Sequence, residues 1–249
     1  MRSGLERRAA RAIERQLAYQ QRKSARIHGH EETVITRMKA HSAAVRARLE
    51  AIRPIALDAH VLEVGSGAHG LIFYFGTTNG VGVDPLADQY AKMFPAWHDR
   101  AKTVSAFGEH LPFEEASFDV VLCDNVVDHA ESPRRILEEI VRVMKPGALL
   151  FFEVNVHHPV YHVAASLHAG WRALGVPFEI TPFADHTCHL TLAAARQLFD
   201  GLPLDIVDES DTVAKVKRNA HSIAIRRTGD RLKRLFYKNA AYEVIARRT

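Results

Sequence analysis

Short apolar runs alternate with longer amphipathic stretches through the middle of the chain. Four runs stand out, at residues 60–64, 81–83, 120–122 and 149–154. Parallel strands need long crossover connections, which are usually helices. The alternation therefore favours βαβ units and an α/β fold built on a parallel sheet.

The first 53 residues predict a helical extension before this region. Ala, Arg, Gln and Glu dominate residues 6–52, where apolar residues recur at roughly helical spacing. We expect two helices with a break near residues 28–30. The second should end before Pro54, because a proline ring cannot continue the helical hydrogen-bond ladder.

Helix start and stop signals predict further elements. Ser132 should cap a helix with Pro133 in its first turn, and that helix should end before Pro146. Later elements follow from similar signals: a helix over 192–200 capped by Thr191, strands near 204–208 and 222–225, and a basic helix over 231–248.

Residues 157–190 match no regular pattern and are rich in histidine and aromatic residues. A connection of this length is unusual in a compact domain, so we expect a partly helical cap. The predicted organisation is then a helical extension at 1–53, an α/β domain at 54–228 with an insert at 157–190, and a C-terminal basic helix at 229–249.

Composition favours one globular domain. The chain has 249 residues, of which 47% are hydrophobic and 25% are charged, as in ordinary folded proteins. No apolar run approaches the roughly 18 residues of a spanning helix, and no apolar segment follows the charges of residues 1–16. With Cys123 and Cys188 read as free thiols, we expect a cytoplasmic protein.

Charge is distributed unevenly. Residues 1–50 carry 12 basic and 5 acidic groups, residues 215–249 carry 11 and 2, and the part between them carries 10 and 22. Basic ends can mark an anionic partner such as RNA or a membrane surface. They can equally dock on the acidic middle, which is the interpretation we favour, so peripheral membrane contact stays open and the oligomeric state is not indicated.

A glycine-rich loop follows the first predicted strand, in the pattern Gly65-x-Gly67-x-x-Gly70. Glycines let a backbone turn sharply and approach a ligand closely. Asp84 ends the next strand, 19 residues after Gly65, where a ribose-binding acid belongs. The motif predicts a nucleoside cofactor, and by itself it leaves nicotinamide dinucleotides open.

Later blocks decide between the cofactors. Four blocks follow one another in an order that resembles the class I S-adenosylmethionine-dependent methyltransferases, of the type 11-like kind. They are Leu111-Pro112-Phe113, residues 118–123, residues 124–129 and residues 136–150. The resemblance covers about residues 55–227. It implies a doubly wound, Rossmann-like sheet of about seven strands that binds S-adenosyl-L-methionine. Residues 65–71 with 82–86 look, more narrowly, like methyltransferases of bacterial glycan or surface-polysaccharide biosynthesis.

The resemblance also implies roles for residues matched by position. At the methionine end of the cofactor it places Glu63, Gly65, Ser66 and Gly67; at the ribose, Asp84; and in the crevice between cofactor and acceptor, Asp124 and Asn125. One departure stands out, because the Asp that often precedes the Leu-Pro-Phe block by four residues is replaced by Phe107. Either Phe107 packs on the adenine or Glu109 substitutes for the missing Asp.

A hydroxyl acceptor needs a general base, for which histidine is suited by its pKa of about 6.5. We favour His157 or His158 after the strand at 149–154, then His129, and then His186 or His189 in the cap. The sequence shows no tight metal-ligand spacing, so no metal is expected.

The predicted function is O-methylation of a small molecule or a saccharide intermediate. The basic ends raise the alternative of an RNA methyltransferase, although residues 124–127 read Asp-Asn-Val-Val where an Asn-Pro-Pro-Tyr-like stretch would be expected, so a nucleic-acid partner is not favoured. Phe107 raises the alternative of a catalytically inactive, cofactor-binding interaction protein. A nicotinamide dehydrogenase is the most distant alternative.

Overall fold

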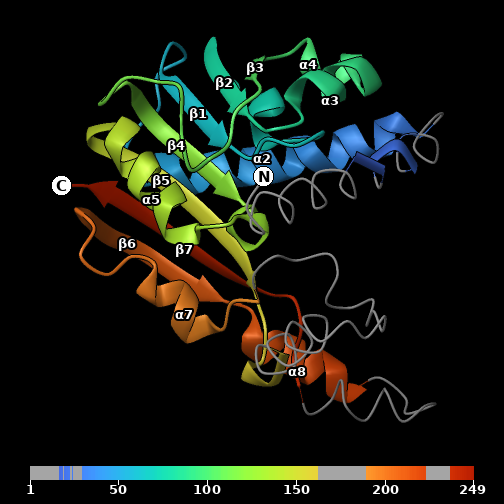
Figure 1. Cartoon of the computed structure of the whole chain (residues 1–249), viewed down its shortest axis with the longest axis vertical. Coiled ribbons are helices and arrows are strands. Elements are labelled where there is room, and N and C mark those ends of the chain that lie inside the picture. The colour runs from blue at the N-terminus through green and yellow to red at the C-terminus, as the bar shows by residue number, and fades with distance from the viewer. Residues whose placement is uncertain (1–16, 19, 23, 25–29, 162–188, 223–235) are drawn as a thin grey trace, which may run out of the picture.

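The structure is a computed structural model that describes residues 17–18, 20–22, 24, 30–161, 189–222 and 236–249. Its centre is a seven-stranded sheet in the order β3-β2-β1-β4-β5-β7-β6 (Figure 1). The strands are β1 His60–Val64, β2 Asn79–Val83, β3 Lys102–Val104, β4 Phe118–Asp124, β5 Met144–Val156, β6 Leu204–Asp211 and β7 Ala240–Arg248. The first five are parallel, and β7 runs antiparallel to both β5 and β6. The predicted α/β sheet of about seven strands is confirmed.

Helices surround this sheet. They are α2 Glu31–Glu50, η1 Leu71–Tyr74, α3 Ala87–Met93, α4 Pro95–His98, η2 Val127–His129, α5 Pro133–Val143, α7 Leu192–Gln197 and α8 Val213–Ser222. The two predicted N-caps are confirmed, because the Ser132 side chain accepts from Arg135 N and the Thr191 side chain accepts from Ala194 N. Within the described ranges, no helix is both long and apolar enough to cross a membrane.

Each face of the sheet has its own hydrophobic core. On one face α5 and α7 contribute Ile136, Leu137 and Ala195 to a cluster with the strands. On the other face α2 and η1 contribute Leu49 and Leu71 to a second cluster. A strand covered on both faces reads as a continuous apolar run, which explains why the runs were visible in the sequence.

The C-terminal prediction is partly wrong. Residues 240–248, expected to be helical, form β7. Ala240, Tyr242 and Val244 are buried and alternate with more exposed residues, the period of a strand. The neighbouring basic residues had suggested a solvated helix. The prediction of a strand at 222–225 is also wrong at Ser222, because this residue ends α8. Residues 223–235 lie outside the described ranges.

The helical extension follows its prediction where it is described. α2 begins after the expected break and ends at Glu50, before Pro54. Figure 1 shows α2 lying across one face of the sheet, so this helix is part of the domain. Most of the predicted first helix and residues 162–188 of the insert lie outside the described ranges, and the proposed domain boundaries stay predictions.

Candidate functional site

The glycine-rich loop leaves β1 in a conformation that needs glycine. Gly65 and Gly67 have φ angles of +72° and +54°, in the left-handed region. A Cβ on Gly65 would lie 2.2 Å from Cγ2 of Val126, and a Cβ on Gly70 would lie 2.2 Å from Oε2 of Glu63. The loop is therefore packed tightly between β1 and the segment after β4.

Glu63 is a buried carboxyl group at the centre of this loop. Its Oε1 accepts from the Leu71 N–H at 3.0 Å, and its Oε2 accepts from the Ile72 N–H at 2.9 Å. Burial raises the pKa of Glu63 to about 8, and the nearby Asp124 and Asp84 carboxylates add to that rise. Glu63 thus holds the start of η1 as well as lining the site.

Asp84 follows β2 and lies beside the loop, where the sequence placed it. Its Oδ2 accepts from the Gly67 N–H at 3.1 Å and its Oδ1 accepts from the Leu86 N–H at 2.8 Å. Both bonds hold the carboxylate next to the glycine-rich loop. The geometry is compatible with the predicted ribose contact.

A cavity of about 310 Å³ opens along the loop. Its walls contain Glu63, residues 65–71, Asp124 and Asn125, and also three residues of the helical extension, Gln20, Arg37 and Met38. The structure thus brings together all four residues predicted for the methionine end. It adds a guanidinium from α2 that the sequence did not indicate.

Asn125 links the segment after β4 to the next strand. Its backbone is left-handed, with φ of +57°. Its N–H donates to the Glu153 carbonyl at 2.8 Å, and its Oδ1 accepts from the Asn155 N–H at 3.3 Å. These bonds fix the wall of the cavity on the β4 side.

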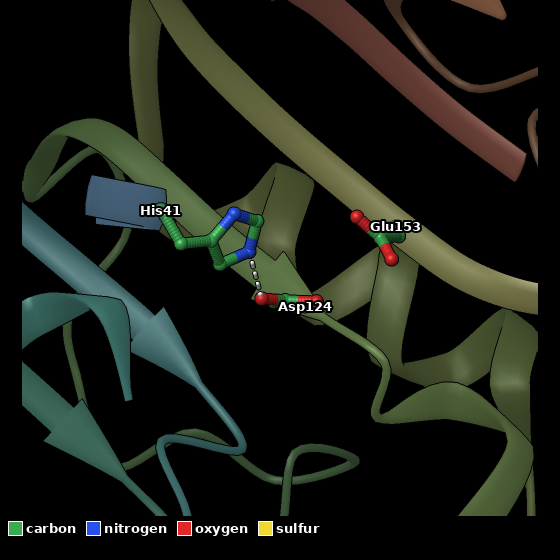
Figure 2. A group of neighbouring side chains, drawn as sticks. All are labelled: His41, Asp124 and Glu153. Atoms are coloured by element: carbon green, nitrogen blue, oxygen red, sulfur yellow. Dashed lines mark hydrogen bonds and ion pairs between the residues drawn. The ribbon is translucent and has the colours of Figure 1, made fainter. Parts of the chain in front are cut away.

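Asp124 meets a histidine of the helical extension (Figure 2). Nε2 of His41, on α2, lies 3.0 Å from Oδ2 of Asp124. This hydrogen bond raises the pKa of His41 against the opposing effect of its partial burial. Glu153 lies next to the pair on β5, and burial together with the Asp124 and Glu243 carboxylates raises its pKa to about 7.

The two residues predicted for the adenine lie apart from this cavity's walls. Phe107, in the loop after β3, is 47% exposed. Glu109 uses Oε1 to accept from the Glu131 N–H at 3.1 Å and the Ser132 N–H at 3.4 Å, just before α5. Glu109 is thus already engaged in holding that turn, and both adenine roles stay predictions.

The predicted base candidates after β5 also lie outside the cavity's walls. His157 is buried, its Nδ1 accepts from the Asn239 N–H at 3.2 Å, and its ring centre lies 5.3 Å from that of His189. His158 packs its ring 4.9 Å from that of Phe236. The side chain of His129, and His186 as a whole, lie outside what the structure describes. The roles of these histidines as bases stay predictions.

The sequence also matches known proteins. Residues 62–152 match the methyltransferase domain family. An uncharacterised methyltransferase of Mycolicibacterium gilvum is 38% identical over 100 residues, which are 39% of this chain and 39% of that protein. A thiol S-methyltransferase of Rattus norvegicus is 44% identical over 92 residues, which are 35% of this chain and 34% of that protein. The match spans about two fifths or less of the length of these relatives.

Solved structures share the fold over a longer stretch. A putative methyltransferase from Bacillus halodurans superposes with a TM-score of 0.57 at 15% identity, covering 81% of this chain and 97% of that one. Geranyl diphosphate C-methyltransferase from Streptomyces coelicolor superposes with a TM-score of 0.57 at 13% identity, covering 83% and 76%. The matched stretch at residues 62–152 and this shared fold make the chain similar to class I S-adenosylmethionine-dependent methyltransferases.

Proposed function

We propose that the chain binds S-adenosylmethionine in the cavity along the glycine loop and methylates a hydroxyl group of a small molecule or saccharide. The observation that carries the proposal is the cavity itself, which is flanked by Asp84 and walled by a loop in which Gly65 and Gly70 leave no room for a Cβ. Such a loop at the carboxyl ends of parallel strands is where doubly wound folds place nucleoside ligands.

Individual residues fit parts of the cofactor. Arg37 is a cation in the cavity wall and would pair with the carboxylate of the methionine end. Glu63 and residues 65–67 would surround the same end, and Asp84 would accept from the ribose hydroxyls. Phe107 or Glu109 would meet the adenine, while Asp124 and Asn125 would separate cofactor from acceptor.

When bound, the cofactor supplies an electrophilic methyl group, which passes to the acceptor as the methyl–sulfur bond breaks and its electron pair stays on sulfur. The chain's main contribution is position, since well-oriented reactants can gain about 7 to 11 kcal/mol over free encounter. A hydroxyl acceptor also gives up a proton, for which His157, His158 and His129 stay our proposed bases.

A thiol acceptor is the second candidate, because a relative that shares 44% identity over 92 residues is a thiol S-methyltransferase. Thiols have a pKa near 8.5, far below that of alcohols, and need less help in losing their proton. The two acceptor classes therefore differ in their need for a base.

The test is transfer of a labelled methyl group by the purified full chain to panels of hydroxyl, thiol, amine and RNA acceptors. Product on hydroxyl compounds and saccharides supports the proposal. Methylation of thiols alone, or of RNA alone, would overturn the hydroxyl acceptor and identify that class as the acceptor instead. Binding of S-adenosylhomocysteine with no transfer to any panel would favour the inactive, cofactor-binding interaction protein.

A further inference from the structure

Three metal-ligating side chains from three different elements converge beside the cofactor cavity. His41 comes from α2, Asp124 from the end of β4 and Glu153 from β5, and Figure 2 shows their polar ends gathered in one place. One ligand atom from each residue can be chosen so that all three lie within 4.8 Å of one another.

The fold holds these side chains in place. Asp124 and Glu153 are register partners in the parallel pair β4 and β5, so their side chains leave the same face of the sheet from neighbouring strands. α2 packs on that face through Val45 and Leu49, which are 2% and 0% exposed. His41 lies one helical turn before Val45 and so faces the same way.

Negative charge is concentrated here without enough positive charge to match it. Glu153 is also the register partner of Glu243 on β7, so carboxylates stand on three adjacent strands. Arg48 engages Glu243 and Asp208. In the part of the chain that the structure describes, the Glu153 carboxylate has neither a hydrogen bond nor an ion pair. A partly buried carboxylate beside two others is unfavourable unless a cation accompanies it.

We propose that His41, Asp124 and Glu153 bind a divalent cation. One imidazole and two carboxylates suit Mn²⁺, Fe²⁺ or Zn²⁺, whereas Mg²⁺ prefers oxygen ligands alone. Ligand atoms about 2.1 Å from a metal lie roughly 3.0 to 4.2 Å apart. The His41–Asp124 separation of 3.0 Å already meets this range, and Glu153, with a ligand atom within 4.8 Å of the other two, would complete the set.

The place of the site suggests its use. Asp124 belongs both to the ligand set and to the wall of the cofactor cavity, so the cation would lie at the edge of that cavity. There it would bind an oxygen of the acceptor and lower the pKa of a hydroxyl. This role rests on the proposed function, but the binding of the cation does not.

The test is calorimetric titration of Mn²⁺, and separately of Zn²⁺, into the chelator-treated full chain without any acceptor. We expect one ion per chain, with affinity falling at least tenfold in both His41→Gln and Glu153→Gln. Matched controls are His221→Gln on α8 and Glu138→Gln on α5, which should bind the ion as the wild type does. Circular dichroism confirms that each variant is folded.

Absence of binding at 1 mM Mn²⁺ and 1 mM Zn²⁺, or equal affinity in wild type and both site variants, would overturn the proposal. If Glu153→Gln does not fold, His41→Gln decides alone, because His41 is partly exposed on its helix. S-adenosylhomocysteine affinity, measured on the same samples, separates the two proposals. If the chain binds S-adenosylhomocysteine but no metal ion, only the metal-site proposal is overturned and the proposed function stands.

Discussion

The carboxylate of Asp84 accepts from the backbone N–H of Gly67 at 3.1 Å, joining the end of β2 to the loop after β1. Asp84 also accepts from Leu86 N–H, so the same side chain fixes the turn into α3. The residue expected to hold the ribose thus also shapes the glycine-rich loop, which we propose binds the rest of the cofactor. Replacing Asp84 should therefore weaken cofactor binding in two ways, by removing the ribose contact and by loosening the glycine-rich loop.

We expect Asp84→Ala to weaken S-adenosylhomocysteine binding by more than tenfold while the chain stays folded. Hydrogen bonds to charged groups contribute roughly 1.5 to 3 kcal/mol each, and 1.4 kcal/mol is a factor of ten. Calorimetry measures the change, with Asp88→Ala on the first turn of α3 as the control. An affinity within threefold of wild type would mean that Asp84 does not contact the cofactor.

Arg37→Ala should discriminate between two ligands that share an adenosine. S-adenosylhomocysteine has an amino-acid carboxylate, whereas methylthioadenosine lacks it. Because Arg37 is the guanidinium in the cavity wall, we expect roughly 10- to 150-fold weaker binding of the first ligand and unchanged binding of the second. Lys39→Ala on the same helix is the control. Equal losses for both ligands would contradict the carboxylate contact.

Glu63 should make stability depend on pH. Its pKa is about 8 in the folded chain against an ordinary value of 4.5, so between these values the folded state holds more protons than the unfolded state. Stability from this group is complete below pH 4.5 and falls as pH rises towards 8, by up to about 1.4 kcal/mol per pH unit. Denaturant unfolding of wild type and Glu63→Gln from pH 5 to 8 measures this loss of unfolding free energy.

The slope of the unfolding free energy against pH, compared between wild type and Glu63→Gln, separates the contribution of Glu63 from that of the other titrating groups. Glu63→Gln should show a shallower decline with pH than wild type, whatever its absolute stability. The conservative Glu138→Gln, on an exposed part of α5, should keep the wild-type slope. Parallel curves for wild type and Glu63→Gln would show that the buried carboxyl titrates near its ordinary value.

The strands at the centre of the sheet could be predicted because burial on both faces makes them continuous apolar runs. β3 could not, since Lys102–Val104 is only three residues long and carries a lysine. β7 was mistaken for a helix because the stretch before and after its apolar core is basic. The antiparallel return of this strand between β5 and β6 is a property of the whole sheet.

The glycine loop and Asp84 could be placed from sequence because strand ends meet at one edge of a parallel sheet. Arg37 and His41 could not, since nothing local says which face of α2 docks beside the loop. Because Arg37 lines the cavity and His41 contacts Asp124, a deletion of residues 1–50 should lower cofactor affinity as well as acceptor recognition.

The most direct test of cofactor identity is calorimetric titration of the wild-type chain with S-adenosylhomocysteine and, separately, with NAD. The glycine loop, Asp84 and the matched methyltransferase domain predict one S-adenosylhomocysteine per chain and no binding of NAD. Saturable binding of NAD with no heat from S-adenosylhomocysteine would contradict the account.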